Sequence, residues 1–526
     1  MHLILLIACL FVFIACCYAT YRRFTRISVA GVPGPEPSSW LLGNMPQLFG
    51  GQVGEAEFKW QEIYGGVVRI KASFGEDRLL VTDPKALQYI YQTSGYRFHK
   101  QPERIELTRM ISGRGILWAD GNDHKRHRKV MLPGFGTPEA RAFLPLFFSY
   151  AAQIGTKWKD IIGATAEQSA VLDVTAWASR ATLDAIGEAA FDYRFGAMEN
   201  EDNVVGTAYS NVFMDTFGSP SDTSLLALNL LQYVPRCIRE FLVDHIPSGR
   251  LRHIRYTAQV TTNVARELVA SKSAALLQGK GSRDIMSLLV KANASENEKT
   301  KLSEDELLSQ MRTVIMAGHE TTSNSFSWAV LELARQPKIQ SRLRTEIRRM
   351  ERTIQARGSC EFNVADIEAM PYLLAVVKEV LRFHPVSFNN FRQSAADDVL
   401  PLFRPITLRS GEVITELPVP KGMKVIISIA AYNRHKDVFG HDAHTFNPER
   451  LTFAGGLRTC IGWRFAVLEL QAFLIELVSN FEFSLTPEAM RIRREACIVM
   501  VPTVEGQRAK GTQLPLRVSV ASREYD

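Results

Sequence analysis

The sequence predicts a mainly helical protein with a small β region, folded as one large body. Two patterns predict this fold class. The long stretch 138–350 has apolar residues at helical spacing. Short runs rich in β-branched residues at Val67–Lys71, Arg78–Thr82 and 405–429 have the character of strands. A prior of about 150 residues per domain suggests three or four domains, but no linker, repeat or low-complexity run interrupts the chain after Trp40.

Composition and charge limit the function classes. The chain has 526 residues, 62 of them basic and 55 acidic, and its net charge of +7 is spread along the sequence. Because there is no dense Lys/Arg block, we expect no nucleic-acid binding, although a basic face would steer an acidic protein partner. The seven cysteines include no CxxC pair. Neither a disulfide framework nor a zinc site is therefore expected, and the body should face a reducing compartment.

Residues 1–20 are predicted to form a single transmembrane anchor. Leu3 to Ala19 are almost wholly apolar, and these 17 residues suffice for the thin bilayer of the endoplasmic reticulum. An arginine cluster follows directly, and the positive-inside rule places it, with everything after it, in the cytosol. The alternative is a cleaved signal peptide, in which positive charge precedes the apolar core, whereas here it follows.

Residues 21–39 are predicted to be a basic stop-transfer segment and a Pro-rich linker. Gly31–Pro37 has three prolines within five residues, which excludes a helix or a central strand. A stiff extended linker would hold the body, residues 40–526, at a fixed angle to the membrane. A disordered spacer explains this segment equally well.

A cysteine before a predicted helix is the strongest candidate for chemistry. Residues 463–478 have one apolar face, which predicts a helix, and Cys460 lies in the Gly-rich turn before it. Free backbone N–H groups and the helix dipole at such a position favour a thiolate. A lone cysteine is usually just a small buried hydrophobic residue. Nearby glycines and Arg458, two residues earlier, indicate instead a ligand that a flat cofactor approaches closely.

The pattern of Phe453, Gly456, Arg458, Cys460 and Gly462 resembles the haem-binding loop of the cytochrome P450 family. The resemblance extends over essentially the whole chain after the predicted anchor. It implies the cytochrome P450 fold, in which a single catalytic domain buries haem b between helices. It also implies that Cys460 is the ligand of the haem iron.

A long predicted helix, 303–335, begins at a capping box and reaches roughly 50 Å at about 1.5 Å per residue. Its middle, 317–322, reads Ala-Gly-His-Glu-Thr-Thr, in which Gly and Thr are poor helix formers. The P450 family has a matching motif. The resemblance implies that Gly318 opens a groove for oxygen and that Glu320 and Thr321 manage proton delivery. The alternative is a helix distortion caused by Thr hydroxyls that bond their own turn.

Three further residues are assigned a structural role by the resemblance. Glu379 and Arg382 lie three apart and share a helix face. In the family such a pair is buried and locks onto an arginine that corresponds to Arg450. The trio is expected to hold the side of the molecule that carries the haem loop.

Three more residues are expected to contact the haem propionates. Arg128 matches a propionate-binding arginine of the family, whereas His124 stands where the family has tryptophan. Arg392 is similar to a further propionate arginine. A metal site formed by His124 and His127 is the weaker alternative, because further ligands are missing nearby.

These features predict a haem-thiolate monooxygenase that inserts one oxygen atom from O2 into a small apolar molecule. The resemblance implies that electrons from NADPH arrive through NADPH-cytochrome P450 reductase, with cytochrome b5 as an optional donor. Residues 32–35 and 175–187 resemble fungal membrane-bound members, many of which act on secondary metabolites such as terpenoids. One alternative is a haem-thiolate isomerase or dehydratase, but the intact Glu320 and Thr321 argue against it. The other alternative is a non-catalytic relative that binds haem or a lipid.

The sequence departs from the family just before the haem loop. Only Leu451 and Thr452 separate Arg450 from Phe453, where family members usually have a longer irregular stretch. Ten residues from Arg450 to Cys460 span at most about 35 Å, so the connection is feasible but has little slack. We therefore expect either weak haem retention or the loss of a short coding piece from this sequence.

Overall fold

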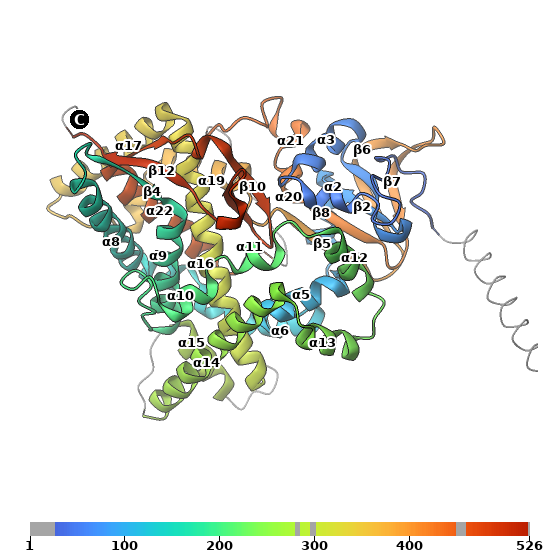
Figure 1. Ribbon diagram of the computed structural model, residues 1–526, viewed down its shortest axis with the longest axis horizontal. Coiled ribbons are helices and arrows are strands. Elements are labelled where there is room, and N and C mark those ends of the chain that lie inside the picture. The colour runs from blue at the N-terminus through green and yellow to red at the C-terminus, as the bar shows by residue number, and fades with distance from the viewer. Residues whose placement is uncertain (1–26, 279–283, 295–300, 449–458, 524–526) are drawn as a thin grey trace, which may run out of the picture.

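The computed structural model describes residues 27–278, 284–294, 301–448 and 459–523. None of the helices within these ranges is long and apolar enough to cross a bilayer. The predicted anchor, residues 1–20, lies outside the described residues. Figure 1 shows helices packed around a long central helix on one side of the molecule and a twisted sheet on the other.

Helices form most of the described chain. The first group is α2 (Met45–Gly50), α3 (Glu55–Tyr64), α4 (Pro84–Gln88), α5 (Pro102–Ser112), α6 (Gly121–Met131), α7 (Thr137–Ala142), α8 (Leu144–Gly163), α9 (Val174–Phe191), α10 (Val204–Tyr209), α11 (Val212–Phe217), α12 (Asp222–Leu231) and α13 (Arg236–His245). The second group is α14 (Gly249–Leu277), α15 (Ile285–Ala294), α16 (Glu304–Arg335), α17 (Pro337–Ala356), α18 (Val364–Glu368), α19 (Pro371–Phe383), α20 (Ile429–Tyr432), α21 (Lys436–Phe439) and α22 (Trp463–Asn480). Single turns are η1 (Ser73–Gly75), η2 (Tyr89–Thr93), η3 (Leu132–Phe135), η4 (Ala489–Arg491) and η5 (Arg508–Lys510).

The described strands form one larger sheet and three small ones. The larger sheet has the order β1-β2-β8-β5-β3, with β1 (Val67–Lys71), β2 (Asp77–Val81), β8 (Lys424–Ser428), β5 (Asn389–Ser394) and β3 (Phe98–Lys100). The small sheets are β4-β12-β9, β6-β7 and β10-β11, with β4 (Ser169–Asp173), β12 (Pro515–Val520), β9 (Phe481–Leu485), β6 (Asp398–Thr407), β7 (Val413–Val419), β10 (Ile492–Ala496) and β11 (Met500–Val504). Only β2 and β8 pair in parallel among the described strands.

Helix α16 crosses the centre of the molecule (Figure 1). The predicted capping box is present, because the Ser303 hydroxyl accepts the Glu306 N–H at 3.2 Å and the Glu306 carboxylate accepts the Ser303 N–H at 2.9 Å. These two bonds satisfy N–H groups that a helix start otherwise leaves unpaired. The helix ends just before Pro337, where α17 begins. Helices α9, α14 and α22 pack against it.

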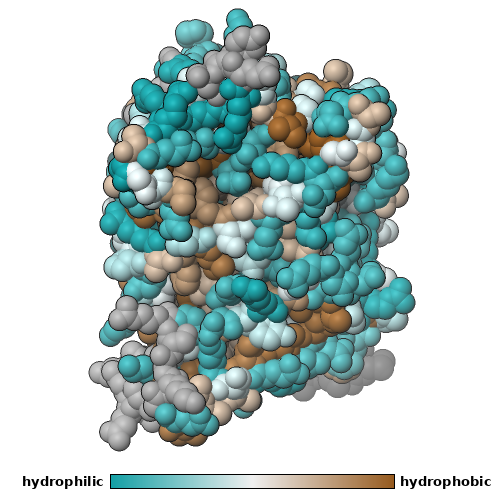
Figure 2. Space-filling model, turned by 90° about the vertical axis from the view of Figure 1, so that its left-hand side faces the viewer, coloured by the Kyte–Doolittle hydropathy of each residue, from teal (hydrophilic) through white to brown (hydrophobic). Residues whose placement is uncertain are grey.

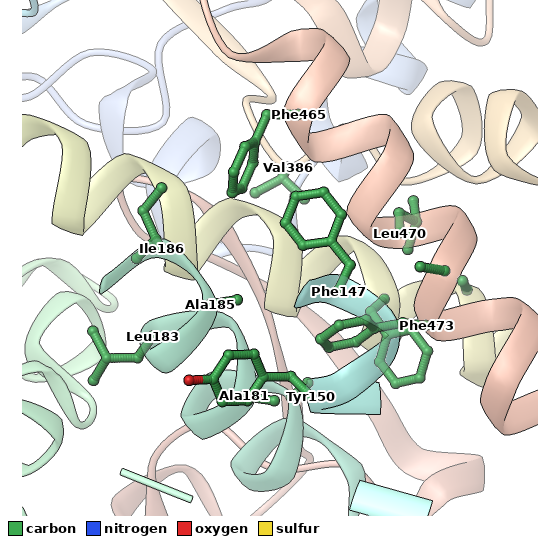
Figure 3. Packing of buried hydrophobic residues seen from close by; sticks show 14 of the residues in the cluster. Phe147, Tyr150, Ala181, Leu183, Ala185, Ile186, Val386, Phe465, Leu470 and Phe473 are labelled. Atoms are coloured by element: carbon green, nitrogen blue, oxygen red, sulfur yellow. The ribbon is translucent and has the colours of Figure 1, made fainter. Parts of the chain in front are cut away.

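The main core lies where α8, α9, α16 and α22 meet, and Figure 3 shows part of it. Phe147 of α8 and Phe465 of α22 form an edge-to-face pair with ring centres 4.7 Å apart. Phe326 of α16 and Phe473 of α22 form a second such pair at 5.8 Å. Buried aromatic pairs add about 0.5–1.5 kcal/mol to the stabilisation from area burial alone. The helix that follows Cys460 is thereby fixed rigidly against the central helix.

The Pro-rich segment lies on the sheet. The Arg69 N–H donates to the Pro33 carbonyl at 2.9 Å, and Val32 is fully buried. A Cβ atom on Gly34 would come within 1.8 Å of the Arg69 carbonyl oxygen, so only glycine allows this close approach to β1. The segment is therefore extended and packed against the body in the described structure.

Most predicted elements are present, with two differences. The helical stretch 138–350 is interrupted by β4, which pairs with β12 at the far end of the chain. The strand-rich patch begins at Asp398 rather than residue 405. The end of the molecule that carries α8 and α17 is covered mostly by hydrophilic side chains, with scattered apolar patches (Figure 2).

Candidate active site

Cys460 lies directly before helix α22, as the sequence predicts. Gly462 is the residue that caps the helix, and its carbonyl accepts the Ala466 N–H at 3.0 Å. Cys460 has exposed surface, yet the surrounding protein atoms desolvate its sulfur and raise the pKa of the thiol. The Gly462 N–H and the Arg128 charge act in the opposite direction but do not outweigh this burial. The thiolate that the helix start was expected to favour therefore needs a bound cation, and a metal ion deprotonates a thiol ligand outright.

Helix α6 is joined to the backbone before Cys460. Arg128 donates a hydrogen bond of 2.8 Å from Nη1 to the Thr459 carbonyl. His124, one turn earlier on α6, is buried, and its Nδ1 lies 2.7 Å from the Tyr96 hydroxyl. Arg128 is thus placed beside the predicted haem ligand, whereas the contact of either side chain with a propionate remains a prediction.

The middle of α16 borders an open space. Between Leu307 and Ala334, every residue of this helix is buried except Arg312, Ala317, Gly318, Glu320 and Thr321. Four of these five exceptions belong to the predicted motif 317–322. A helix that runs through the core shows part-exposed positions in its middle only where neighbouring side chains leave room. The Cys460 thiol as a ligand, the nearby Arg128 donor and the part-exposed middle of α16 fit a large flat cofactor held by Cys460.

The motif side chains make specific contacts without breaking the helix. The Thr321 hydroxyl donates to the Ala317 carbonyl at 2.7 Å, and α16 stays helical through the motif. The anticipated bonding of Thr to its own turn is therefore present, and the helix tolerates it. The Glu320 carboxylate accepts the Asn324 amide at 3.2 Å.

Gly318 permits close packing between two helices. A Cβ atom at this position would come within 2.5 Å of the Ile186 side chain on α9. Any larger residue would push α9 and α16 apart. Its expected role in opening a groove for oxygen remains a prediction.

The Glu379–Arg382 pair is buried, as expected from the resemblance. Arg382 contacts both carboxylate oxygens at 2.7 Å. Its remaining N–H groups donate to the carbonyls of Asn433, Ala443 and Thr445, so all five are used. Through its described contacts the pair therefore holds the backbone that leads toward the haem loop.

The structure does not test the expected haem contacts of several predicted residues. Arg392 lies on β5, is mostly buried, and donates from Nη1 to the Phe391 carbonyl at 3.0 Å. Its expected propionate contact remains a prediction. The residues of the predicted site that lie outside the described residues are Arg450, Phe453, Gly456 and Arg458.

The sequence reasoning missed Glu469, which lies on α22 nine residues after Cys460. It is fully buried, and burial raises the pKa of its carboxyl well above the usual value. It faces the Thr322 hydroxyl on α16. A lone acid on the apolar face of a predicted helix was the available signal.

A cavity of about 720 Å³ lies elsewhere, beside α3, β6 and α21. Charged side chains such as Asp83, Arg404 and Lys436 line it, and Cys460 and the α16 motif do not. The positions of Cys460 and the motif therefore define the candidate site, rather than this cavity.

Comparison with known proteins agrees with this geometry. The family described as Cytochrome P450 matches residues 33–507. "Cytochrome P450 monooxygenase 205" of Postia placenta is 31% identical, and the alignment covers 93% of this chain and 92% of that protein. "Cytochrome P450 monooxygenase claQ" of Ampulloclitocybe clavipes is 31% identical over 87% of each chain.

The chain belongs to the cytochrome P450 family. The predicted family, the mainly helical P450 fold and the enzyme class of P450 monooxygenases are confirmed. "Cytochrome P450 monooxygenase 128" of Postia placenta, a further similar protein, is 32% identical over 93% of this chain and 92% of its own.

Proposed function

We propose that the protein inserts one oxygen atom from O2 into an apolar small molecule, with haem b held by Cys460. The observation that carries this proposal is the opening beside Ala317, Gly318, Glu320 and Thr321 in the otherwise buried α16. A haem-thiolate supplies oxygen activation when bound, because the sulfur ligand pushes electron density to the iron. The protein supplies the ligand, the orientation and the protons.

The residues around Cys460 hold the cofactor in this proposal. Arg128 fixes the Thr459 carbonyl and thereby the approach of the chain to Cys460. Arg128, His124 and Arg392 bind the two propionates, because each has N–H donors suited to a carboxylate. The aromatic pair of Phe147 and Phe465 keeps α22 from shifting.

Proton delivery is assigned to Glu320 and Thr321. The Thr321 hydroxyl proton is engaged with the Ala317 carbonyl, and rotation about one side-chain bond turns it toward the open space. Glu320 is oriented by the Asn324 amide. Part exposure of both side chains admits water, which replaces the proton that each transfer consumes.

The substrate class and the partners follow from the family rather than from pocket geometry. We propose a fungal secondary metabolite of terpenoid character as substrate, in line with the fungal relatives. NADPH-cytochrome P450 reductase is the proposed electron donor, with cytochrome b5 as an optional second donor. Residues 1–20 are proposed to anchor the protein in the endoplasmic reticulum membrane, with the catalytic domain, residues 40–526, on the cytosolic side.

The proposal is tested on the full-length protein in microsomes that contain the reductase. We expect the reduced protein under carbon monoxide to show the red-shifted Soret band of thiolate ligation. The Cys460→Ser variant should lose it, because serine cannot supply the sulfur ligand. Substrate-dependent consumption of both O2 and NADPH is expected of the wild type. Product formation without oxygen would indicate an isomerase or dehydratase, and haem binding without any turnover would indicate a non-catalytic relative.

Haem content also tests the short connection between Arg450 and Phe453. We propose that this exact chain binds haem below one equivalent, or that its transcript contains an additional coding piece. Haem per protein measures the first and transcript sequencing the second. Full haem occupancy together with a matching transcript would show that the short connection is sufficient.

A further inference from the structure

His319, at the centre of the α16 motif, is fully buried. Its ring lies edge-on to the Tyr209 ring of α10, with ring centres 4.9 Å apart. The Thr182 hydroxyl of α9 donates to the His319 carbonyl at 3.2 Å. Contacts from α9 and α10 therefore fix both the backbone and the ring of this residue.

The hydrogen bonds of the ring determine which nitrogen carries a proton. Nδ1 lies 3.1 Å from the Ile315 carbonyl oxygen, which can only accept, so Nδ1 must donate. In a neutral ring Nε2 then has a bare lone pair. Within the described ranges, Nε2 has no hydrogen-bond partner, and the Glu320 Oε1 atom lies 3.4 Å away.

This arrangement leaves the buried Nε2 lone pair without a donor beside a carboxylate oxygen. A buried lone pair that faces an ionised carboxylate is both unsatisfied and repelled. A proton on Nε2 gives an ion pair, and a proton on the carboxylate gives a neutral donor aimed at the ring.

We infer that His319 and Glu320 hold one proton between them and that His319 recharges Glu320 during proton delivery. The inference rests on the proposed role of Glu320. In the first step the protonated His319 ring passes its Nε2 proton to the Glu320 carboxylate and becomes neutral. In the second step the Glu320 carboxyl gives that proton toward the Thr321 hydroxyl and is again a carboxylate. Water that reaches the part-exposed Glu320 then returns one proton to the pair, so each cycle consumes one proton from solvent.

Two other titratable groups near the pair, Tyr209 and Cys497, have raised pKa values. Burial raises the pKa of Tyr209 to about 12. Burial also raises the pKa of the Cys497 thiol, which lies just after β10 and feels Glu320 and Asp215. Asp215 on α11 is engaged with His253 at 2.9 Å.

Arg312 also lies on α16, and its positive charge lowers the pKa of Tyr209, against the larger effect of burial. Its guanidinium donates to the Met110 and Ile111 carbonyls at 3.0 Å. Burial lowers the pKa of Arg312, but an arginine remains protonated at physiological pH. Exchange of a proton in this region is thus expected of His319 and Glu320.

The test compares His319→Gln and His319→Leu with wild type as holoenzymes, with Tyr209→Phe as a matched control. The control keeps the aromatic neighbour of His319 and removes only its hydroxyl. The first readout is the infrared band of protonated carboxyl groups between pH 5 and 9. We expect a band that changes with pH, disappears in Glu320→Gln, and shifts its midpoint by at least one pH unit in both His319 variants. Two variants of different polarity guard against a folding defect in one of them.

The second readout is product formed per NADPH as a function of pH. Above neutral pH we expect a fall of roughly tenfold in both His319 variants, less than the roughly 100-fold contribution of a complete general acid. Tyr209→Phe should match wild type in both readouts. An unchanged infrared midpoint in the His319 variants would overturn the inference, whatever the activity. A coupled infrared titration in a protein that never consumes O2 would support the pair and contradict the proposed function.

Discussion

Arg128 of α6 donates a 2.8 Å hydrogen bond to the carbonyl of Thr459, the residue that precedes Cys460. The two residues are 331 positions apart in the sequence. This bond ties the helix that carries two of the predicted propionate ligands to the chain that carries the predicted iron ligand. Cofactor binding and placement of the cysteine are therefore coupled through one guanidinium group.

Replacement of Arg128 by Gln is expected to weaken haem retention. A hydrogen bond from a charged donor contributes about 1.5–3 kcal/mol, which corresponds to roughly a 10- to 150-fold loss in haem affinity. Haem per protein after gel filtration is the measurement. Lys129→Gln on the same helix removes an equal charge from an exposed position and serves as the control. Equal haem content in both variants would contradict the role of Arg128.

Replacement of Thr321 by Ala is expected to uncouple electron use from product formation. The variant lacks the hydroxyl that lies at the open middle of α16, so NADPH is still consumed but hydrogen peroxide is released. A fall of about 10²-fold in product per NADPH is within the range of lost acid–base assistance. Ser325→Ala, one turn along, removes a hydroxyl that donates to the Thr321 carbonyl at 2.8 Å and is the matched control. Wild-type yield per electron in Thr321→Ala would exclude a role in proton delivery.

Replacement of Arg382 by Lys should destabilise the protein by about 2–6 kcal/mol, because lysine has three donors for the five buried acceptors of Arg382 and each unsatisfied buried acceptor costs about 1–3 kcal/mol. Lysine retains the charge but cannot form five hydrogen bonds in this fixed arrangement. Denaturant unfolding measures the effect. Arg450→Ala should cost less than half as much, because the five described hydrogen bonds of Arg382, including both to Glu379, remain in that variant. An equal cost for both variants would mean that Arg450 is an essential third member.

Stability should fall between pH 6.5 and pH 4 because of His384. Burial lowers the pKa of His384 from 6.5 to about 4, despite the adjacent Glu332 carboxylate at 2.8 Å. A neutral buried histidine stabilises the fold fully above pH 6.5, and this contribution decreases as the pH approaches 4. The loss is on the order of 2–3 kcal/mol.

Glu332 contributes to pH stability in a lower range. Burial opposes its ionisation, but hydrogen bonding and charge from His384 and Arg335 prevail and lower its pKa to about 2. A depressed carboxyl pKa stabilises the fold above about pH 4.5 and loses this effect as the pH falls through 2. His384→Gln keeps a donor for Glu332 without the titration, so its stability should vary less between pH 6.5 and 4. Urea unfolding at each pH is the measurement, and identical pH profiles would refute the assignment.

The sequence by itself determined the features that depend on neighbouring residues. The capping box at Ser303, the helix after Cys460 and the motif 317–322 all follow from local spacing and helix-end chemistry, which act over a single turn. The family motif around Cys460 likewise needs no distant partner to be recognised. These local rules also predicted the strands β1 and β2 with nearly their observed bounds.

The tertiary structure alone decided which distant groups meet. The periodicity of a segment does not identify its partner, so the pairing of β4 with β12 and the bond from Arg128 to Thr459 were not predictable. Burial is also a property of the whole fold, and it opposes ionisation of both Glu469 and Cys460. The distance from the His319 ring to the Glu320 carboxylate likewise depends on packing by α9 and α10. Such electrostatic effects depend on three-dimensional distance and on the exclusion of water, which a linear sequence does not specify.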